Sequence, residues 1–267
     1  MAAIREMLRQ ARADGFLDEN AEAKVCQDIV LKALSESSLC RNATIKGGVV
    51  MRSITGDSRR ATQDMDIDFI RYSISDDSIR AFILALDCLP GIHIVQTGSI
   101  TELKQQDYHG KRVHVRITDY SGDVIESKID LGVHKHLDLE QQEYCFDIAF
   151  DEKGVSLLIN SFEQMYAEKL RSLLKFGPYS TRYKDIYDMF FHCNRLNRDM
   201  LLQCFEVYIF HDSEMREKNM SDIVQRVKTT FDDNNYRKRV DESDKRWIDD
   251  DIETIFSGII KYLESLY

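Results

Sequence analysis

One short run, residues 63–70, alternates acidic and apolar side chains and constrains the fold more than any other segment. Successive side chains of a β-strand point to opposite faces, so the run predicts a strand with one apolar face and one face of concentrated negative charge. The aspartates on the charged face are Asp64, Asp66 and Asp68. Close like charges repel unless water screens them or a cation lies between them, and Mg²⁺ prefers carboxylate oxygens. The run therefore indicates either a solvated strand face or a Mg²⁺ site.

The composition is that of an ordinary globular chain. Its 267 residues, 43% of them hydrophobic, suffice for one large or two modest domains. The net charge of −10 argues against a non-specific nucleic-acid coat, although a local basic groove stays open. The six cysteines form no C-x-x-C pair, which favours reduced core residues over disulfides or zinc ligands. Without a membrane-length apolar run or a signal-peptide core, the sequence predicts a cytoplasmic protein with no membrane partner.

Periodicity separates a mixed α/β part from a helical part. The first part predicts two helices before residue 38, a helix capped by Ser75, and period-two strands between residues 92 and 150. The helices expected in the second part span residues 161–175, 182–195, 197–211, 221–231 and 249–267. We therefore expect an α/β domain with N-terminal helices over residues 1–155 and a helical domain over residues 156–267.

A glycine pair, Gly47-Gly48, stands between a predicted strand at residues 44–46 and a predicted short helix at residues 49–54. Glycines let the backbone approach a phosphate closely, and a helix N-terminus presents free N–H groups to anions. The pair predicts either a phosphate-binding turn or simply a tight turn.

Two further groups of charged residues fit the chemistry of a phosphate-transfer site. Asp130 lies on the polar face of a predicted strand, and a neighbouring strand would bring it beside the aspartate pair; alone it would be a surface strand residue. Asp185 and Asp188 share one helical face, and Lys169 on an adjacent helix would bind a triphosphate. An ordinary salt bridge between the two helices explains the same residues.

Three motifs in this order resemble the signature of the AbiEii/AbiGii toxins, which are nucleotidyltransferase-like toxins of abortive-infection and type IV toxin–antitoxin systems. Residues 45–48 (IKGG) and 60–66 (RATQDMD) are similar to the pattern KGG followed by R-x-T/S-x-D-x-D. Residues 167–174 (AEKLRSLL) and 182–188 (RYKDIYD) resemble helices with the patterns EKL-x-A-L and R-x-K-D-x-x-D. The resemblance spans roughly residues 40–195.

This resemblance implies an α+β fold: a DNA polymerase β-like nucleotidyltransferase core, built of a mixed sheet with helices, followed by a C-terminal helical bundle. It also implies Mg²⁺ as cofactor, with Asp68 secondary to the metal ligands Asp64, Asp66 and Asp130. The implied catalytic residues are Asp64, Asp66, Asp130, Lys169 and Asp185, and the implied nucleotide-binding residues are Gly47, Gly48, Lys169 and Asp188. One departure concerns Val49, where the wider superfamily often has serine; the nearest hydroxyl along the chain is that of Ser53.

The implied reaction is in-line attack of an acceptor oxygen on the α-phosphorus of a nucleoside triphosphate, with release of pyrophosphate. By family analogy the acceptor is RNA, such as a tRNA 3′ end, and a cognate antitoxin is a further partner. Two alternatives stay open: transfer onto a protein side chain, and an inactive relative that binds a nucleotide or a partner. The basic residues expected to hold RNA are Arg171, Lys175, Arg182 and Lys184.

Two other clusters carry weaker expectations. His134 and His136 would share one strand face as metal ligands, but a solvated turn is the favoured interpretation. The segment 236–239 combines a tyrosine with three cations and would follow an RNA backbone, but acidic neighbours favour an exposed, self-neutralising loop. His192 is expected to pack in a core.

Overall fold

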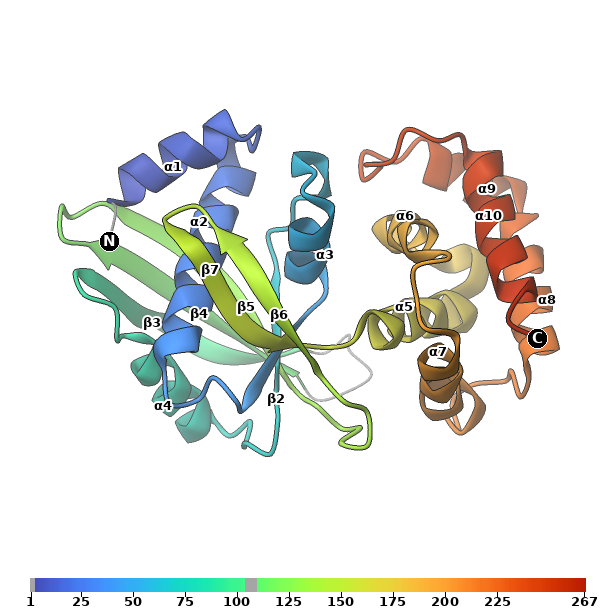
Figure 1. Cartoon of the computed structure of the whole chain (residues 1–267), viewed down its shortest axis with the longest axis horizontal. Helices are drawn as coiled ribbons and strands as arrows, with labels where there is room; N and C mark the ends of the chain where they lie inside the picture. The colour runs from blue at the N-terminus through green and yellow to red at the C-terminus, as the bar shows by residue number, and fades with distance from the viewer. Residues whose placement is uncertain (1–2, 104–109) are drawn as a thin grey trace. The chain divides into compact units, whose positions relative to one another are not determined.

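The computed structural model describes residues 3–103 and 110–267 (Figure 1). Residues 1–2 of the predicted α/β domain and residues 104–109 of the predicted strand region lie outside the described residues. The chain divides into two compact units, Met1–Asn160 and Ser161–Tyr267.

The first unit combines a mixed sheet with four α-helices in its described residues. The strands are β1 (Ala43–Lys46), β2 (Met65–Phe69), β3 (Ile92–Leu103), β4 (Gly110–Asp119), β5 (Val124–Val133), β6 (Gln142–Ile148) and β7 (Asp151–Ile159). The helices are α1 (Ile4–Ala13), α2 (Asp18–Glu36), α3 (Gly48–Thr55) and α4 (Asp76–Leu86), with a 3₁₀ turn at Ser58–Arg60. The strand order is β3-β4-β5-β2-β1-β7-β6. The pairs β1–β7 and β2–β5 are parallel, and the other neighbours are antiparallel.

The acidic run forms β2, as its alternation predicts. Met65, Ile67 and Phe69 are buried on one face, and the ring of Phe69 meets that of Phe82 of α4 edge-on at 5.0 Å. The N-terminus of α4 is capped by the Ser75 hydroxyl, which accepts a hydrogen bond from the Ser78 N–H. The apolar face of β2 therefore docks on a helix, which leaves the aspartates on the opposite face.

The last strand of the sheet, β7, lies beyond the period-two strands that the sequence analysis names, which end at residue 150. β6 and β7 form a hairpin, and Val155, Leu157 and Ile159 of β7 are buried alternately. β7 is also parallel to β1, so it lies inside the sheet rather than at its edge. The first unit consequently ends at Asn160, beyond the expected boundary at residue 155.

The second unit is helical throughout its described residues. Its elements are α5 (Phe162–Phe176), η2 (Gly177–Tyr179), α6 (Tyr183–His192), α7 (Arg198–Phe205), a π-helical turn η3 (Glu206–Phe210), α8 (Met220–Phe231), α9 (Asn234–Asp241) and α10 (Ile252–Glu264). Aromatic rings fill the core: Phe231 stacks on Phe256 at 3.9 Å, and Tyr166 meets Tyr262 at 5.8 Å. The α+β part and the helical part of the predicted fold class are both confirmed.

Helix α9 contradicts the expectation of an exposed loop at residues 236–239. Tyr236 is fully buried and its ring is parallel to those of Phe231 and Phe256. Arg239 donates to the Pro178 carbonyl. A buried tyrosine cannot stack on a base, so this segment is not an RNA platform of the expected kind.

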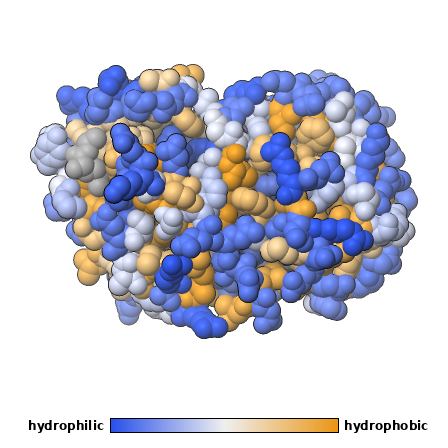
Figure 2. All heavy atoms as spheres, in the orientation of Figure 1, coloured by the Kyte–Doolittle hydropathy of each residue, from blue (hydrophilic) through white to orange (hydrophobic). Residues whose placement is uncertain are grey.

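Hydrophilic residues cover most of the face seen in Figure 2, in line with a chain of which 31% is charged. Among the described helices, none combines the length and apolar character needed to cross a bilayer.

Candidate functional site

A row of four charged residues crosses the middle of the sheet. Lys46 of β1 is the register partner of Asp66 on β2, Asp66 is the partner of Asp130 on β5, and Asp130 is the partner of Arg112 on β4. Register partners on adjacent strands point to the same face. The row therefore places two carboxylates side by side between two cations, and it brings Asp130 next to the aspartate run.

Two of the carboxylates are held by cations from neighbouring strands. The Arg112 guanidinium donates from Nε to Asp130 Oδ1 and from Nη2 to Asp130 Oδ2, both at 2.7 Å. Lys128 Nζ lies 2.6 Å from Asp64 Oδ1, an ion pair rather than an aligned hydrogen bond. Asp130 is nearly buried, with 8% of its side chain exposed, whereas the Asp64 side chain is 50% exposed. Negative charge on this face is thus largely compensated within the first unit.

Asp66 lies at the centre of this charge cluster and is half-buried. Its burial raises the pKa of Asp66 to about 6; Lys46 opposes this rise, and Asp130, Asp64 and Asp68 add to it. Lys46 Nζ also lies 2.8 Å from Asp68 Oδ2. Like charges that raise a carboxyl pKa in this way are relieved when a cation binds.

The glycine turn approaches Asp66 from the start of α3. Gly47 has a φ of +67°, and a Cβ at this position would lie 2.6 Å from Asp66 Oδ2. A Cβ on Gly48 would lie 2.5 Å from Thr62 Oγ1. Neither glycine can carry a side chain here, so the backbone entering α3 lies against the aspartate.

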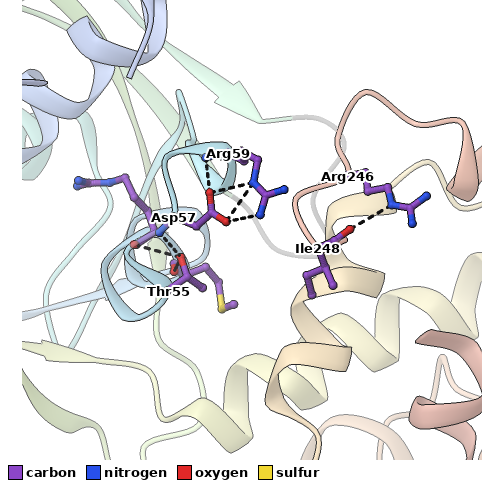
Figure 3. A network of polar contacts seen from close by, with 7 residues as sticks. Thr55, Asp57, Arg59, Arg246 and Ile248 are labelled. Carbon is purple, nitrogen blue, oxygen red and sulfur yellow. Dashed lines mark hydrogen bonds and ion pairs between the residues drawn. The ribbon is translucent and has the colours of Figure 1, made fainter. Parts of the chain in front are cut away.

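The segment that joins α3 to β2 is fixed by polar contacts. In Figure 3 the Asp57 carboxylate accepts from the backbone N–H of Arg59 at 2.8 Å and from its guanidinium. The Thr55 hydroxyl accepts from the Asp57 N–H. Gln27 of α2 donates its side-chain amide to the Thr62 carbonyl at 2.8 Å. These contacts set the approach of the chain to the aspartates.

The hydroxyl of Ser53 is not turned to the glycines, since it lies 3.2 Å from the hydroxyl of Tyr144. In space, the hydroxyl next to the glycine pair is that of Thr62, which belongs to the R-x-T-x-D-x-D segment. Thr62 is therefore the candidate to supply the hydroxyl that a serine at position 49 would provide.

The second unit brings together Lys169, Asp185 and Asp188. Lys169 Nζ lies 2.5 Å from Asp185 Oδ1 and 2.8 Å from Asp188 Oδ2. Asp188 is fully buried, and its Oδ1 accepts from Trp247 Nε1 at 3.2 Å. Burial lowers the pKa of nearby His192 to about 4, with Lys169 contributing in the same direction. The salt bridge between the two helices, one of the two sequence interpretations, is thus present, and His192 packs in the core as expected.

The basic residues expected to hold RNA also belong to the second unit. Arg171 donates to Asp212 at 2.7 Å, and Lys175 donates to Glu214 at 2.9 Å. Arg182 is exposed, with 62% of its side chain accessible to solvent. Lys184, the fourth of the set, is half-buried on α6. Part of the positive charge of these four residues, here called the RNA track, is consequently offset by acidic neighbours.

The fit of a metal ion rests on the aspartates of the first unit. Among the described residues, no three His, Cys, Asp or Glu side chains are grouped closely enough to hold a metal ion. Two features nevertheless suit a cation: buried Asp68 Oδ1 accepts no hydrogen bond from residues 3–103 or 110–267, and Gly47 keeps side-chain atoms away from Asp66 Oδ2. The oxygens of Asp64, Asp66 and Asp130 are ligands that Mg²⁺ accepts, once the cations that hold Asp64 and Asp130 move.

Several participants were not predicted from the sequence. Arg112 belongs to none of the sequence motifs, and its contact with Asp130 depends on the register of β4 against β5. The predicted solvated turn at His134 is wrong, because His134 is buried and its Nε2 lies 2.8 Å from the Gln141 amide and 3.0 Å from the His136 carbonyl. The partner of Arg112 depends on strand register, whereas the contacts of His134 lie within the segment 134–141.

Comparison with known proteins identifies the family of the chain. No curated protein matches the chain. A solved structure, described as an antigenic nucleotidyltransferase-like protein from Paracoccidioides brasiliensis, is 14% identical and covers 80% of this chain and 92% of its own, with a TM-score of 0.40. That likeness is too slight to carry an argument. A sequence profile of the family described as "Nucleotidyl transferase AbiEii toxin, Type IV TA system" matches residues 29–258. The chain therefore belongs to the AbiEii nucleotidyl transferase toxin family.

Proposed function

We propose that this protein is a Mg²⁺-dependent nucleotidyltransferase toxin that transfers a nucleotide from a nucleoside triphosphate to RNA. The observation that carries the proposal is the pairing of Asp66 with Asp130 on adjacent strands, together with a glycine turn that approaches Asp66 and leaves no space for a side chain at Gly47. Paired carboxylates beside a phosphate-binding turn are what transfer of an anionic phosphoryl group needs.

The residues of the first unit have two proposed roles, metal binding and phosphate binding. Asp64, Asp66 and Asp130 would hold the divalent cation, which, when bound, stabilises the charge on the attacking and leaving oxygens. The backbone N–H groups at Gly47 and Gly48 would bind the triphosphate, because both positions lie at the N-terminus of α3. The protein thus contributes mainly position and charge.

In the second unit, Asp185 and Lys169 complete the proposed catalytic set, and Lys169 is also proposed to contact the nucleotide. Their mutual ion pair supports a role in orienting the lysine, since an ammonium held between Asp185 and Asp188 points in a fixed direction. Asp188 supports this arrangement from a fully buried position and is proposed to act indirectly.

RNA is the proposed acceptor, with a tRNA 3′ end as the first candidate. Its support is the AbiEii membership and the basic side chains Arg171, Lys175, Arg182 and Lys184. The type IV toxin–antitoxin family further suggests a cognate antitoxin as partner, a role in abortive infection and action in the cytoplasm. Transfer onto a protein side chain is the second candidate, favoured by the acidic neighbours that offset Arg171 and Lys175.

One experiment tests the proposal. The full chain is incubated with Mg²⁺, each of the four labelled nucleoside triphosphates and either total RNA or total protein. Label in RNA that requires Mg²⁺ supports the proposal. Label in protein replaces the acceptor, and binding of nucleotide without any transfer would favour an inactive relative.

A further inference from the structure

Each aspartate proposed to bind metal lies near a cation of the sheet. Within the described part of the chain, Asp130 is the one of the three whose two carboxylate oxygens both accept hydrogen bonds from a cation. Arg112 approaches it in the fork geometry that a guanidinium makes with a carboxylate, with two hydrogen bonds of 2.7 Å. Charge-assisted bidentate pairs of this kind are among the strongest polar contacts in proteins. While this pair persists, both acceptor oxygens of Asp130 are directed at arginine rather than at the position beside Asp66.

The position of Arg112 makes this contact more than a surface ion pair. Asp130 has only 8% of its side chain exposed, and Arg112 has 31%. Arg112 lies at the end of the charged row, and the electrostatic attraction that it feels extends beyond Asp130 to Asp64 and Asp66. A divalent cation held by these three carboxylates would compete with the guanidinium for the same negative charge, and the two positive groups would repel each other.

We propose that Arg112 is a positioning residue of the metal site: it holds the Asp130 carboxylate when no metal is bound and must release it for a divalent cation to bind. The inference rests on the proposed function, because it concerns the same carboxylates. It makes the guanidinium a built-in competitor of the metal, so that the third carboxylate joins the site only when a cation arrives.

The same pair of strands supplies a matched control. Arg116 lies on the same face of β4 and is the register partner of Glu126 on β5, which accepts from its Nε at 2.9 Å. That pair is more exposed, at 51% and 58% of the two side chains. It repeats the chemistry of the Arg112–Asp130 pair away from the aspartates.

The test measures Mn²⁺ binding to the full chain by the loss of the electron paramagnetic resonance signal of free Mn²⁺, without nucleotide. Arg112→Gln should bind Mn²⁺ more tightly than the wild type, on the order of tenfold, because one charge-assisted pair no longer competes. Arg112→Lys, which keeps the charge but not the fork, should fall between the two and remains informative if the glutamine variant does not fold. Arg116→Gln should bind as the wild type does.

A purely structural role for Arg112 predicts the opposite sign, since a disturbed site binds metal less well. Equal or weaker binding by both Arg112 variants, with Asp66→Asn weaker than wild type, would overturn the inference and leave the proposed metal site standing. Absence of Mn²⁺ binding in the wild type and in Arg112→Gln, with nucleoside triphosphate present as well, would overturn the proposed metal-dependent function itself.

Discussion

Asp66 of β2 and Asp130 of β5 are direct register partners on adjacent parallel strands. Burial raises the pKa of Asp66 to about 6, and the negative charge of the neighbouring Asp130 contributes to this rise. The charged face is compact because Lys46 and Arg112 close the row at its two ends. A site of this kind gains stability when a cation enters it.

Replacing Gly47 tests the close approach of the glycine turn to Asp66. Gly47→Ala introduces a Cβ that would lie 2.6 Å from Asp66 Oδ2 and imposes a φ of +67° on a residue with a side chain. We expect loss of nucleotide binding by titration calorimetry and a loss of stability of roughly 1–3 kcal/mol in urea unfolding. Gly56→Ala is the control, because Gly56 has a similar φ of +64° but, in the described structure, no atom within 4 Å of the added Cβ. Equal nucleotide affinities in the two variants would rule out the close approach as the reason for the glycine.

Replacing Lys169 should cost stability as well as nucleotide affinity. Lys169→Ala leaves Asp185 and fully buried Asp188 without their shared cation, and breaking one side of a buried pair typically costs about 3–5 kcal/mol. Lys228→Ala is the control in the same unit, since its pair with Glu264 is solvent-exposed and its loss should have little effect on the free energy of unfolding. Denaturant unfolding separates the two variants. A loss no larger for Lys169→Ala than for Lys228→Ala contradicts the buried network.

The buried side chain of His192 should make the stability of the protein depend on pH. The pKa of this buried side chain is lowered from 6.5 to about 4. Between pH 4 and pH 6.5 the histidine is therefore protonated in the unfolded chain but neutral in the folded chain. The free energy of unfolding should therefore be unaffected by His192 above pH 6.5 and fall below it, by at most about 1.4 kcal/mol per pH unit down to pH 4. His192→Gln should remove this component, and replacing exposed His211 by Gln should not. Identical pH profiles for wild type and His192→Gln would refute the assignment.

Reversing two cations tests the proposed RNA track. Lys175→Glu combined with Arg182→Glu should weaken RNA binding and make its logarithmic salt dependence less steep by roughly two, one for each lost phosphate contact. Nucleotide affinity should change little. Lys238→Glu, at a side chain 71% exposed on α9, controls for net charge. If the double variant labels RNA at the wild-type rate at moderate salt, the RNA track is wrong, and a protein side chain becomes the favoured acceptor.

The local features of this fold could be predicted from the sequence because their causes are local. Alternation defines β2, Ser75 and Ser161 cap their helices through the N–H groups of Ser78 and Gln164, and the glycine pair marks the turn before α3. Each depends on residues within one turn or one strand.

Features that depend on register could not be predicted in the same way. The pairing of Asp66 with Asp130 was anticipated only as a contact that a neighbouring strand would permit. The hydrogen-bonded ion pair between Arg112 and Asp130 was not anticipated. β7 was not named as a strand of its own, because its burial depends on joining β1 in the sheet interior. The helix α9 was not predicted, because its buried Tyr236 is surrounded by charged residues in the sequence. These are contacts between distant segments, which hydrophobic periodicity does not encode.

The most direct measurement of the central claim is nucleotide transfer to RNA by Asp66→Asn beside Asp77→Asn, whose aspartate is 97% exposed on α4. With Mg²⁺ and labelled nucleoside triphosphate, wild type and Asp77→Asn should label RNA equally, and Asp66→Asn should be slower by at least about a hundredfold. In the absence of metal, Asp66→Asn should melt no lower than wild type at pH 7, because it removes a carboxyl whose pKa is raised to about 6 in the fold. A folded Asp66→Asn variant that labels RNA at the wild-type rate would contradict the account.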